Sequence, residues 1–202
     1  MTVEREAVEL RPLLRPRSVA IIGVSPEAGS LGGNVLANLT RIGFGGDIHL
    51  VSRNNREIGG RTCVGSIDEL PEGIDVAVLA VPRQASIDAV KACVRRKIGA
   101  ALVFASGFAE MDEAGRAEQD AMARIATEAG LALCGPNCIG LVNLTDRVAL
   151  TFEPLSFPPP SPPPQAGEGR EGVVRRLSSV ISPCPRSKTC ATVSPRPRRR
   201  RK

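Results

Sequence analysis

Short apolar runs alternate with longer amphipathic stretches over residues 12–154. The runs are rich in Val, Ile, Leu and Ala, and Gly, Pro or Ser stands at most of their ends. A strand that is apolar on both faces must be covered on both, which is typical of parallel sheets. The predicted strands span residues 18–25, 47–51, 74–82, 99–106 and 131–134.

The stretches between these runs carry helical patterns. Within residues 83–97, Ile87, Val90 and Val94 fall on one helical face. The other expected helices are residues 29–46, ending near Gly43, residues 112–130, from an Asp112 cap to Gly130, and a short one with the Ser-x-x-Glu capping pattern at Ser66 and Glu69. Strands and helices in alternation predict an α/β fold, a doubly wound parallel sheet that is Rossmann-like.

The composition narrows the class of protein. With no Trp, no Tyr and five Phe, the core must be packed mainly from aliphatic side chains. No apolar run approaches the roughly 20 residues that span a bilayer, and the N-terminus is charged where a signal peptide needs an apolar segment. A cytoplasmic protein is expected. Its six irregularly spaced cysteines resemble ordinary reduced thiols.

The net charge of +6 comes from the C-terminal end of the chain. Residues 1–155 hold 16 basic and 19 acidic side chains, whereas residues 156–202 hold 11 basic and 2 acidic ones and ten of the seventeen prolines. Such a segment buries too little apolar surface to offset the entropy of ordering. We therefore expect an N-terminal extension at 1–11, a domain at 12–154 and a disordered tail at 155–202.

A glycine-rich turn follows the first predicted strand, in the segment GVSPEAGSLGGNV. Glycines let the backbone approach a ligand closely, and the free amides of a helix N-terminus attract anions. In doubly wound sheets, ligands bind beyond the carboxyl ends of the strands. The turn therefore indicates a ligand that carries phosphate, although glycines that only make a tight turn would look the same.

Two observations narrow the choice of ligand. Ser25 and Ala28 replace the second and third glycines of the dinucleotide fingerprint, and no acid follows the second strand to hold an NAD ribose. Arg53 and Arg56 stand there instead. A cation at the adenosine end favours a ribose with an extra phosphate, as in coenzyme A or NADP. The alternative is that Arg53 is a solvated loop charge.

Four segments resemble the CoA-binding domain of NDP-forming acyl-CoA synthetases: residues 18–39, which include the glycine turn, residues 45–82, and the motifs ASGFAE and CGPNCIGLVN. The resemblance covers about residues 12–154. That family includes ADP-forming acetate-CoA ligases and the succinyl-CoA synthetase alpha subunit. The resemblance implies that CoA lies across the strand ends. By the resemblance, the phosphates would be held by Ser25, Gly29, Ser30, Leu31 and Gly32, and the nucleotide by Val51, Arg53, Val81 and Pro82. The pantetheine path would be lined by Ser106, Gly107 and Phe108, and the thiol end would lie near Asn137 and Cys138.

One loop departs from the family pattern. The family often has Val-Asn-Pro followed by Lys or Arg after the second strand, whereas this chain has Val51, Ser52, Arg53 and Asn54. The expected cation is displaced, and either Arg53 or Arg56 would have to substitute for it. Loss of a charge-assisted phosphate contact would weaken binding without abolishing it.

The segment LALCGPNCIGLVN places two cysteines around a Gly-Pro-Asn turn. The cysteine spacings do not form the paired sets typical of zinc, and no neighbouring histidine activates a thiol. A Cys134 to Cys138 disulfide is not expected in a cytoplasmic protein. Cys134 is interpreted as core strand, and Cys138 either contacts the CoA thiol region or belongs to a purely structural turn.

No catalytic residue is assigned. Enzymes of the resembled family relay phosphate through a histidine on a second domain, whereas His49, the single histidine here, lies inside the second strand. We therefore expect a CoA-binding module that is inactive without ligase or ATP-grasp domains from a separate chain. We also expect a gene that is truncated or frame-shifted near Leu155, or interrupted there by a repetitive element that is read through as protein. The alternative is a CoA- or NADP-binding regulatory protein whose basic tail binds nucleic acid.

Overall fold

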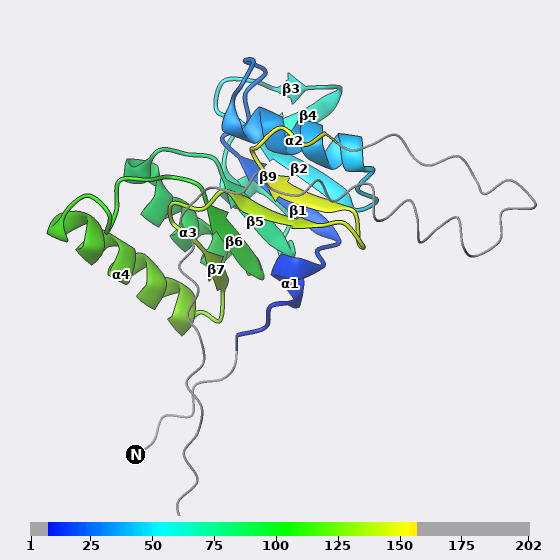
Figure 1. Ribbon diagram of the computed structural model, residues 1–202. Coiled ribbons are helices and arrows are strands. Elements are labelled where there is room, and N and C mark those ends of the chain that lie inside the picture. Colours follow the sequence, from blue (N-terminus) through cyan, green and yellow to red (C-terminus); the bar gives the residue numbers. More distant parts are fainter. Residues whose placement is uncertain (1–7, 157–202) are drawn as a thin grey trace, which may run out of the picture. The chain divides into compact units, whose positions relative to one another are not determined.

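The computed structural model describes residues 8–156, and its centre is a seven-stranded sheet in the order β3-β4-β2-β1-β5-β6-β7 (Figure 1). All neighbouring strands are parallel except β3 and β4 at one edge. The five predicted strands are confirmed. The strands are β1 Ser18–Ile22, β2 Asp47–Val51, β3 Glu57–Ile58, β4 Arg61–Val64, β5 Val76–Leu79, β6 Ala100–Val103 and β7 Ala132–Cys134.

The predicted helices are also present, with ends that the sequence explains. The Asp112 side chain accepts a hydrogen bond from the Gly115 amide at 2.7 Å and so caps α4. Gly43 ends α2 in the left-handed region, with a φ of 73°. The helices are α1 Arg11–Leu14, α2 Leu31–Ile42, α3 Arg83–Arg95, α4 Glu113–Glu128 and the 3₁₀ helix η1 Ile67–Glu69.

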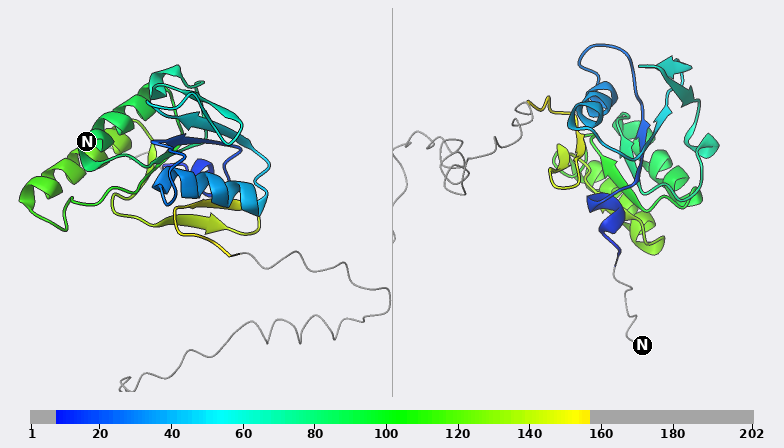
Figure 2. Two further views of the ribbon diagram at one scale, coloured as in Figure 1. Left: turned by 90° about the horizontal axis from the view of Figure 1, so that it is seen from above. Right: turned by 90° about the vertical axis from the view of Figure 1, so that its right-hand side faces the viewer.

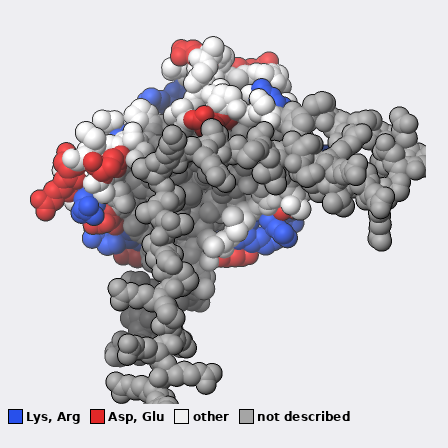
Figure 3. Space-filling view, in the orientation of Figure 1, with Lys and Arg blue, Asp and Glu red and all other residues white. Residues whose placement is uncertain are grey.

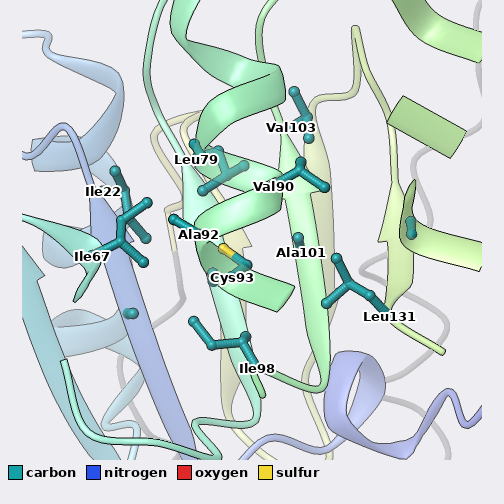
Figure 4. Packing of buried hydrophobic residues seen from close by; sticks show 14 of the residues in the cluster. Ile22, Ile67, Leu79, Val90, Ala92, Cys93, Ile98, Ala101, Val103 and Leu131 are labelled. Atoms are coloured by element: carbon teal, nitrogen blue, oxygen red, sulfur yellow. The ribbon is translucent and has the colours of Figure 1, made fainter. Parts of the chain in front are cut away.

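Both faces of the sheet are covered, as the apolar strands require (Figure 2). On one face, α3 and α4 bury a cluster that includes Leu79, Val90 and Cys93 (Figure 4). On the other face, α2 packs over the sheet with Val35 and Leu39 fully buried. The aliphatic core expected from the composition therefore forms two layers, one on each side of the sheet.

A hairpin that the sequence patterns did not predict completes the second layer. It consists of β8 Gly140–Asn143 and β9 Val148–Thr151, paired antiparallel. Asn38, in α2, is 1% exposed and donates hydrogen bonds from Nδ2 to the carbonyl oxygens of Thr151 and Glu153, both at 2.8 Å. A buried asparagine thus holds the end of the hairpin against α2.

The expectations about the tail, from disorder to nucleic-acid binding, fall on residues 157–202 and lie outside the described residues. Within the described range, acidic and basic side chains are interspersed, as on α4 in Figure 3. No helix among residues 8–156 is long and apolar enough to cross a membrane.

Candidate functional site

A cleft of about 920 Å³ opens where β1, β2, β4 and β5 end at the carboxyl edge of the sheet. Its apolar surface comes from strand ends and from η1, through Ile22, Val51 and Ile67. The volume lies in the range of cofactor and small-molecule sites. The strands β2 and β5 both follow β1 in the chain but lie on opposite sides of it in the sheet. Doubly wound sheets bind ligands at the carboxyl edge beside such a reversal of strand order.

The turn from β1 into α2 depends on glycines with no room for a side chain. A Cβ on Gly23 would clash with the carbonyl oxygen of Ala80, the residue after β5, and Gly23 has a φ of 85°. A Cβ on Gly32 would lie 2.8 Å from the Val24 Cα. Glycine is therefore required there for the helix to begin close to the strand.

Polar groups then fix the loop between strand and helix. The Ser30 hydroxyl donates to the Ser25 carbonyl oxygen at 2.8 Å, and the Ser25 hydroxyl accepts from the Glu27 amide at 3.2 Å. The first backbone hydrogen bond of α2 is donated by the Asn34 amide to the Ser30 carbonyl oxygen. The amides of the three residues before Asn34 are thus the unsatisfied donors of a helix start, and they can bind an anion.

The residues predicted to hold the phosphates and the nucleotide fall into two groups. Those that line the cleft are Ser25, Val51, Arg53, Val81 and Pro82. Gly29, Ser30, Leu31 and Gly32 lie beside it, in the turn and first helical residues that follow Ser25. Gly29 has a φ of 80°, and no atom lies within 4 Å of the place that a Cβ would take there, so the space above it is open.

The charge of the cleft is mixed. Arg53 and Arg95 line it together with Glu27, Asp68 and Asp88, whereas Arg56 does not line it. Arg95 donates to Asp68 at 2.9 Å, and Lys91 donates to Asp88 at 3.2 Å. Among residues 8–156, Arg53 makes no salt bridge. Arg53 is therefore the lining cation most available to a phosphate group.

The wall that α3 contributes to the cleft was not predicted from the sequence. This wall consists of one helical face with small residues at its centre: Ala85, Asp88, Ala89, Ala92 and Arg95. The spacing of three or four residues between these positions is visible in the sequence. The larger apolar residues of the same helix, from which it was predicted, belong to its face toward the core. Alanines at helical spacing, just after a strand end, are the sequence pattern that could have indicated this wall.

The three residues predicted for the pantetheine path lie beyond β6 and outside the cleft lining. The Phe108 side chain is fully buried in the core, with the Arg83 guanidinium 5.5 Å from its ring centre. It therefore lines no open path, which corrects that part of the prediction. Ser106 is exposed, and the Gly107 amide donates to the Glu110 carboxylate at 2.6 Å. Hydrogen bonds from the backbone amide of Glu110 itself and from the Gly107 amide lower the pKa of Glu110.

The Gly-Pro-Asn turn forms after β7, with a cis Gly135–Pro136 peptide bond. The Asn137 amide donates to the Ala105 carbonyl oxygen at 2.9 Å, and the Cys138 thiol lies 3.4 Å from the Val103 carbonyl oxygen. Asn137 and Cys138 thus lie at the carboxyl ends of β6 and β7, on the cleft's edge of the sheet but not in its lining. Cys134 ends β7, as predicted.

The remaining candidates for chemistry are few in the part of the chain that the structure describes. His49 is half-buried in β2 opposite Ala20 of β1, as expected of a structural residue. No group of three or more metal-ligating side chains was found among residues 8–156. The four cysteines in this range are free thiols.

Comparison with known proteins gives a consistent result. Residues 17–143 match the family model described as "CoA binding domain". The chain is 46% identical over 140 residues to a trans-feruloyl-CoA synthase from an unknown prokaryotic organism, which covers 69% of this chain and 20% of that protein. It is 34% identical to ADP-forming acetate–CoA ligase I of Archaeoglobus fulgidus, again over 69% of this chain and 20% of that protein.

Among solved structures, an acetyl-coenzyme A synthetase of Candidatus Korarchaeum cryptofilum, in complex with phosphate and ADP, superposes with a TM-score of 0.68 at 27% identity. The match covers 72% of this chain and 31% of that one. The chain spans between 20% and 34% of the length of the curated relatives it matches. The likeness therefore concerns one domain of these much longer proteins.

Proposed function

Because this chain belongs to the family of CoA binding domains, we propose that its cleft binds coenzyme A through the 3′-phosphorylated ADP end of that molecule. The observation that carries this proposal is Arg53, exposed in the cleft lining and without a salt bridge in the described range. It follows the end of β2, the strand that pairs with β1, and it lines the same cleft as Ser25 of the glycine turn. An additional phosphate on the ribose would give it a partner.

The residues present fit such a ligand. The unsatisfied amides at the start of α2 suit the pyrophosphate, and the open space above Gly29 leaves room for it. The apolar surface of Ile22, Val51 and Ile67, with the alanines of α3, suits an adenine ring. The acidic lining groups Asp68 and Asp88 already have cationic partners, which reduces their repulsion of phosphate.

The pantetheine arm would leave the cleft along the carboxyl edge of the sheet, toward the β6 and β7 ends. Ser106, Gly107, Asn137 and Cys138 lie along this edge. CoA itself supplies the thiol that accepts an acyl group. This chain's residues bind and orient it, and no side chain in the described range is proposed to react.

At the level of the whole protein, we propose a role in NDP-forming acyl-CoA synthesis. The relatives named as acetate–CoA ligases are three to five times longer than the region they share with this chain, as the covered fractions of 20% to 34% indicate. Two of them, both from Pyrococcus furiosus, are named as a subunit alpha. Ligase or ATP-grasp domains in the same or a separate chain would then complete the enzyme, in the cytoplasm.

Titration calorimetry with the full chain tests the site. We expect CoA to bind more tightly than 3′-dephospho-CoA, and Arg53→Ala to weaken CoA binding about tenfold, equivalent to about 1.4 kcal/mol, while leaving 3′-dephospho-CoA binding unchanged. Arg56→Ala is the matched control, because Arg56 is exposed on the same loop but does not line the cleft. It should change CoA binding less than twofold.

The outcomes separate the two parts of the proposal. Absence of CoA binding to the folded wild-type chain would overturn the CoA site. Equal affinity for CoA and 3′-dephospho-CoA would retain the site but remove Arg53 from the 3′-phosphate. Tighter binding of NADP than of CoA would favour the alternative ligand with a 2′-phosphate.

A further inference from the structure

The thiols of Cys134 and Cys138 are brought together by the turn after β7. The chain reverses through Gly135, Pro136 and Asn137, so that the Cys138 sulfur lies 3.7 Å from the Cys134 carbonyl oxygen. Both side chains are half-buried and pack against the same apolar cluster, on the α2 side of the sheet. The pair is therefore accessible in part and shares one environment.

The pKa values of this pair differ from those of Cys63 and Cys93, the other two cysteines in the described range. A hydrogen bond from the Cys138 thiol lowers the pKa of Cys134 to about 6, and the same bond, together with burial, raises the pKa of Cys138. Burial raises the pKa of Cys93 to about 12, and burial and the Glu57 carboxylate raise that of Cys63. Thiolates are the reactive form of cysteine, so Cys134 is the described cysteine best suited to attack.

The loop leaves the sulfurs room to approach each other. Gly135 has a φ of 100°, and a Cβ there would lie 3.3 Å from the Cys138 sulfur. Because glycine stands at this position, no side chain of residue 135 presses on the Cys138 sulfur. A disulfide needs the sulfurs at about 2.05 Å, which a local adjustment of this three-residue turn has to supply.

We propose that Cys134 and Cys138 form a dithiol that exchanges with low-molecular-weight disulfides and closes a reversible disulfide across the turn. The Cys134 thiolate attacks one sulfur of the disulfide, a mixed disulfide forms, and one thiol leaves with a proton from solvent. The Cys138 thiol then loses its proton and attacks the Cys134 sulfur, releasing the second thiol. Two cysteine thiols are oxidised and one disulfide is reduced to two thiols.

This exchange is compatible with the free thiols of the structure. The sequence led us to expect no Cys134 to Cys138 disulfide in a cytoplasmic protein, and the proposal departs from that expectation because transient bridges in such compartments serve redox sensing. The exchange does not depend on the proposed CoA site. Its expected consequence is a cross-link between the end of β7 and the segment that leads into β8.

Oxidised glutathione is the probe for this exchange. The full chain with Cys184→Ser and Cys190→Ser keeps four of the six cysteines, all of them in the described range. After incubation near neutral pH, free thiols are blocked by alkylation and the protein is cut with trypsin. Residues 125–147 form one peptide that contains both Cys134 and Cys138, whereas Cys63 and Cys93 fall on two others.

We expect the 125–147 peptide to lose two hydrogens and to escape alkylation, and dithiothreitol to reverse this. The peptides with Cys63 and Cys93 should be alkylated. In Cys138→Ser, glutathione should remain attached to Cys134. Two alkylated thiols in the 125–147 peptide of the parent protein, or a persistent glutathione adduct there, would overturn the proposal. Because the parent protein decides this alone, the result stands even if the Cys138→Ser variant does not fold.

Discussion

At the scale of single residues, two asparagines of α2 attach the hairpin and the segment after it to that helix. Asn38 uses both ends of its amide, because its Oδ1 also accepts from the Leu155 amide at 3.3 Å. Asn34, one helical turn earlier, makes one comparable bond, to the Phe152 carbonyl oxygen at 3.0 Å. Buried polar groups left without partners are costly, so the two asparagines should differ in their effect on stability.

We therefore expect Asn38→Ala to lower the free energy of unfolding by about 2–3 kcal/mol, because it leaves the buried Thr151 carbonyl group and the partly buried Glu153 carbonyl group without this donor. Asn34→Ala should cost about 1 kcal/mol or less, since it removes one partly buried bond. Urea unfolding followed by far-ultraviolet circular dichroism measures both, as the chain has no Trp or Tyr. An equal loss of unfolding free energy in the two variants would show that Asn38 is not the main residue that holds the hairpin in place.

Cys93 gives a pH dependence at the same scale. Its pKa of about 12 in the folded state, raised mainly by burial despite the nearby Arg95 charge, lies above the value of about 8.5 expected for the unfolded chain. Above about pH 8.5 the unfolded state releases this proton while the folded state keeps it. The folded state is then disfavoured by up to about 1.4 kcal/mol per pH unit.

Unfolding of wild type and of Cys93→Ala at pH 8, 9 and 10 isolates this effect. The alanine variant is expected to be less stable at pH 8 because it leaves a cavity, and its stability should fall less steeply with pH. Parallel pH profiles of the two proteins would contradict the assignment. Retention of the Cys93 proton up to high pH also explains why its peptide serves as a control for thiol exchange.

At the scale of elements, the junction of β1 with α2 depends on close backbone approach. Glycine is a poor helix former, so Gly32 and Gly33 at the start of α2 cost helical stability. Their position is explained by the neighbouring backbone, since a Cβ on Gly33 would lie 2.9 Å from the Ser25 carbonyl oxygen. Packing thus outweighs helix propensity at this junction, which shapes the proposed phosphate site.

Gly32→Ala should therefore destabilise the protein by about 1–3 kcal/mol, even though alanine favours helix, because the Val24 backbone has to shift. Gly45→Ala is the matched control, since no atom lies within 4 Å of its Cβ position. Urea unfolding compares the two, and calorimetry with CoA measures the effect on the site. A stabilising Gly32→Ala would show that the junction has room for a side chain.

At the scale of the whole described domain, residues far apart in sequence converge on one edge of the sheet. Ser25, Arg53 and Val81 follow three different strands, and they meet because parallel strands share the direction of their carboxyl ends. Helix α3 then supplies a wall of small residues, whose alanines leave the cleft open. The cleft is a consequence of strand order as much as of any single motif.

The sequence alone determined the strands, the main helices and their parallel arrangement, because apolar periodicity and the caps at Asp112 and Gly43 act locally. It also indicated the glycine turn and Arg53 as candidate binding residues, because each directly follows a predicted strand in the sequence. Only the tertiary structure decided that the hairpin covers the second face and that Phe108 is buried. Likewise, the contribution of α3 and the pairing of Arg95 with Asp68 depend on contacts between distant segments, and local patterns do not encode such contacts.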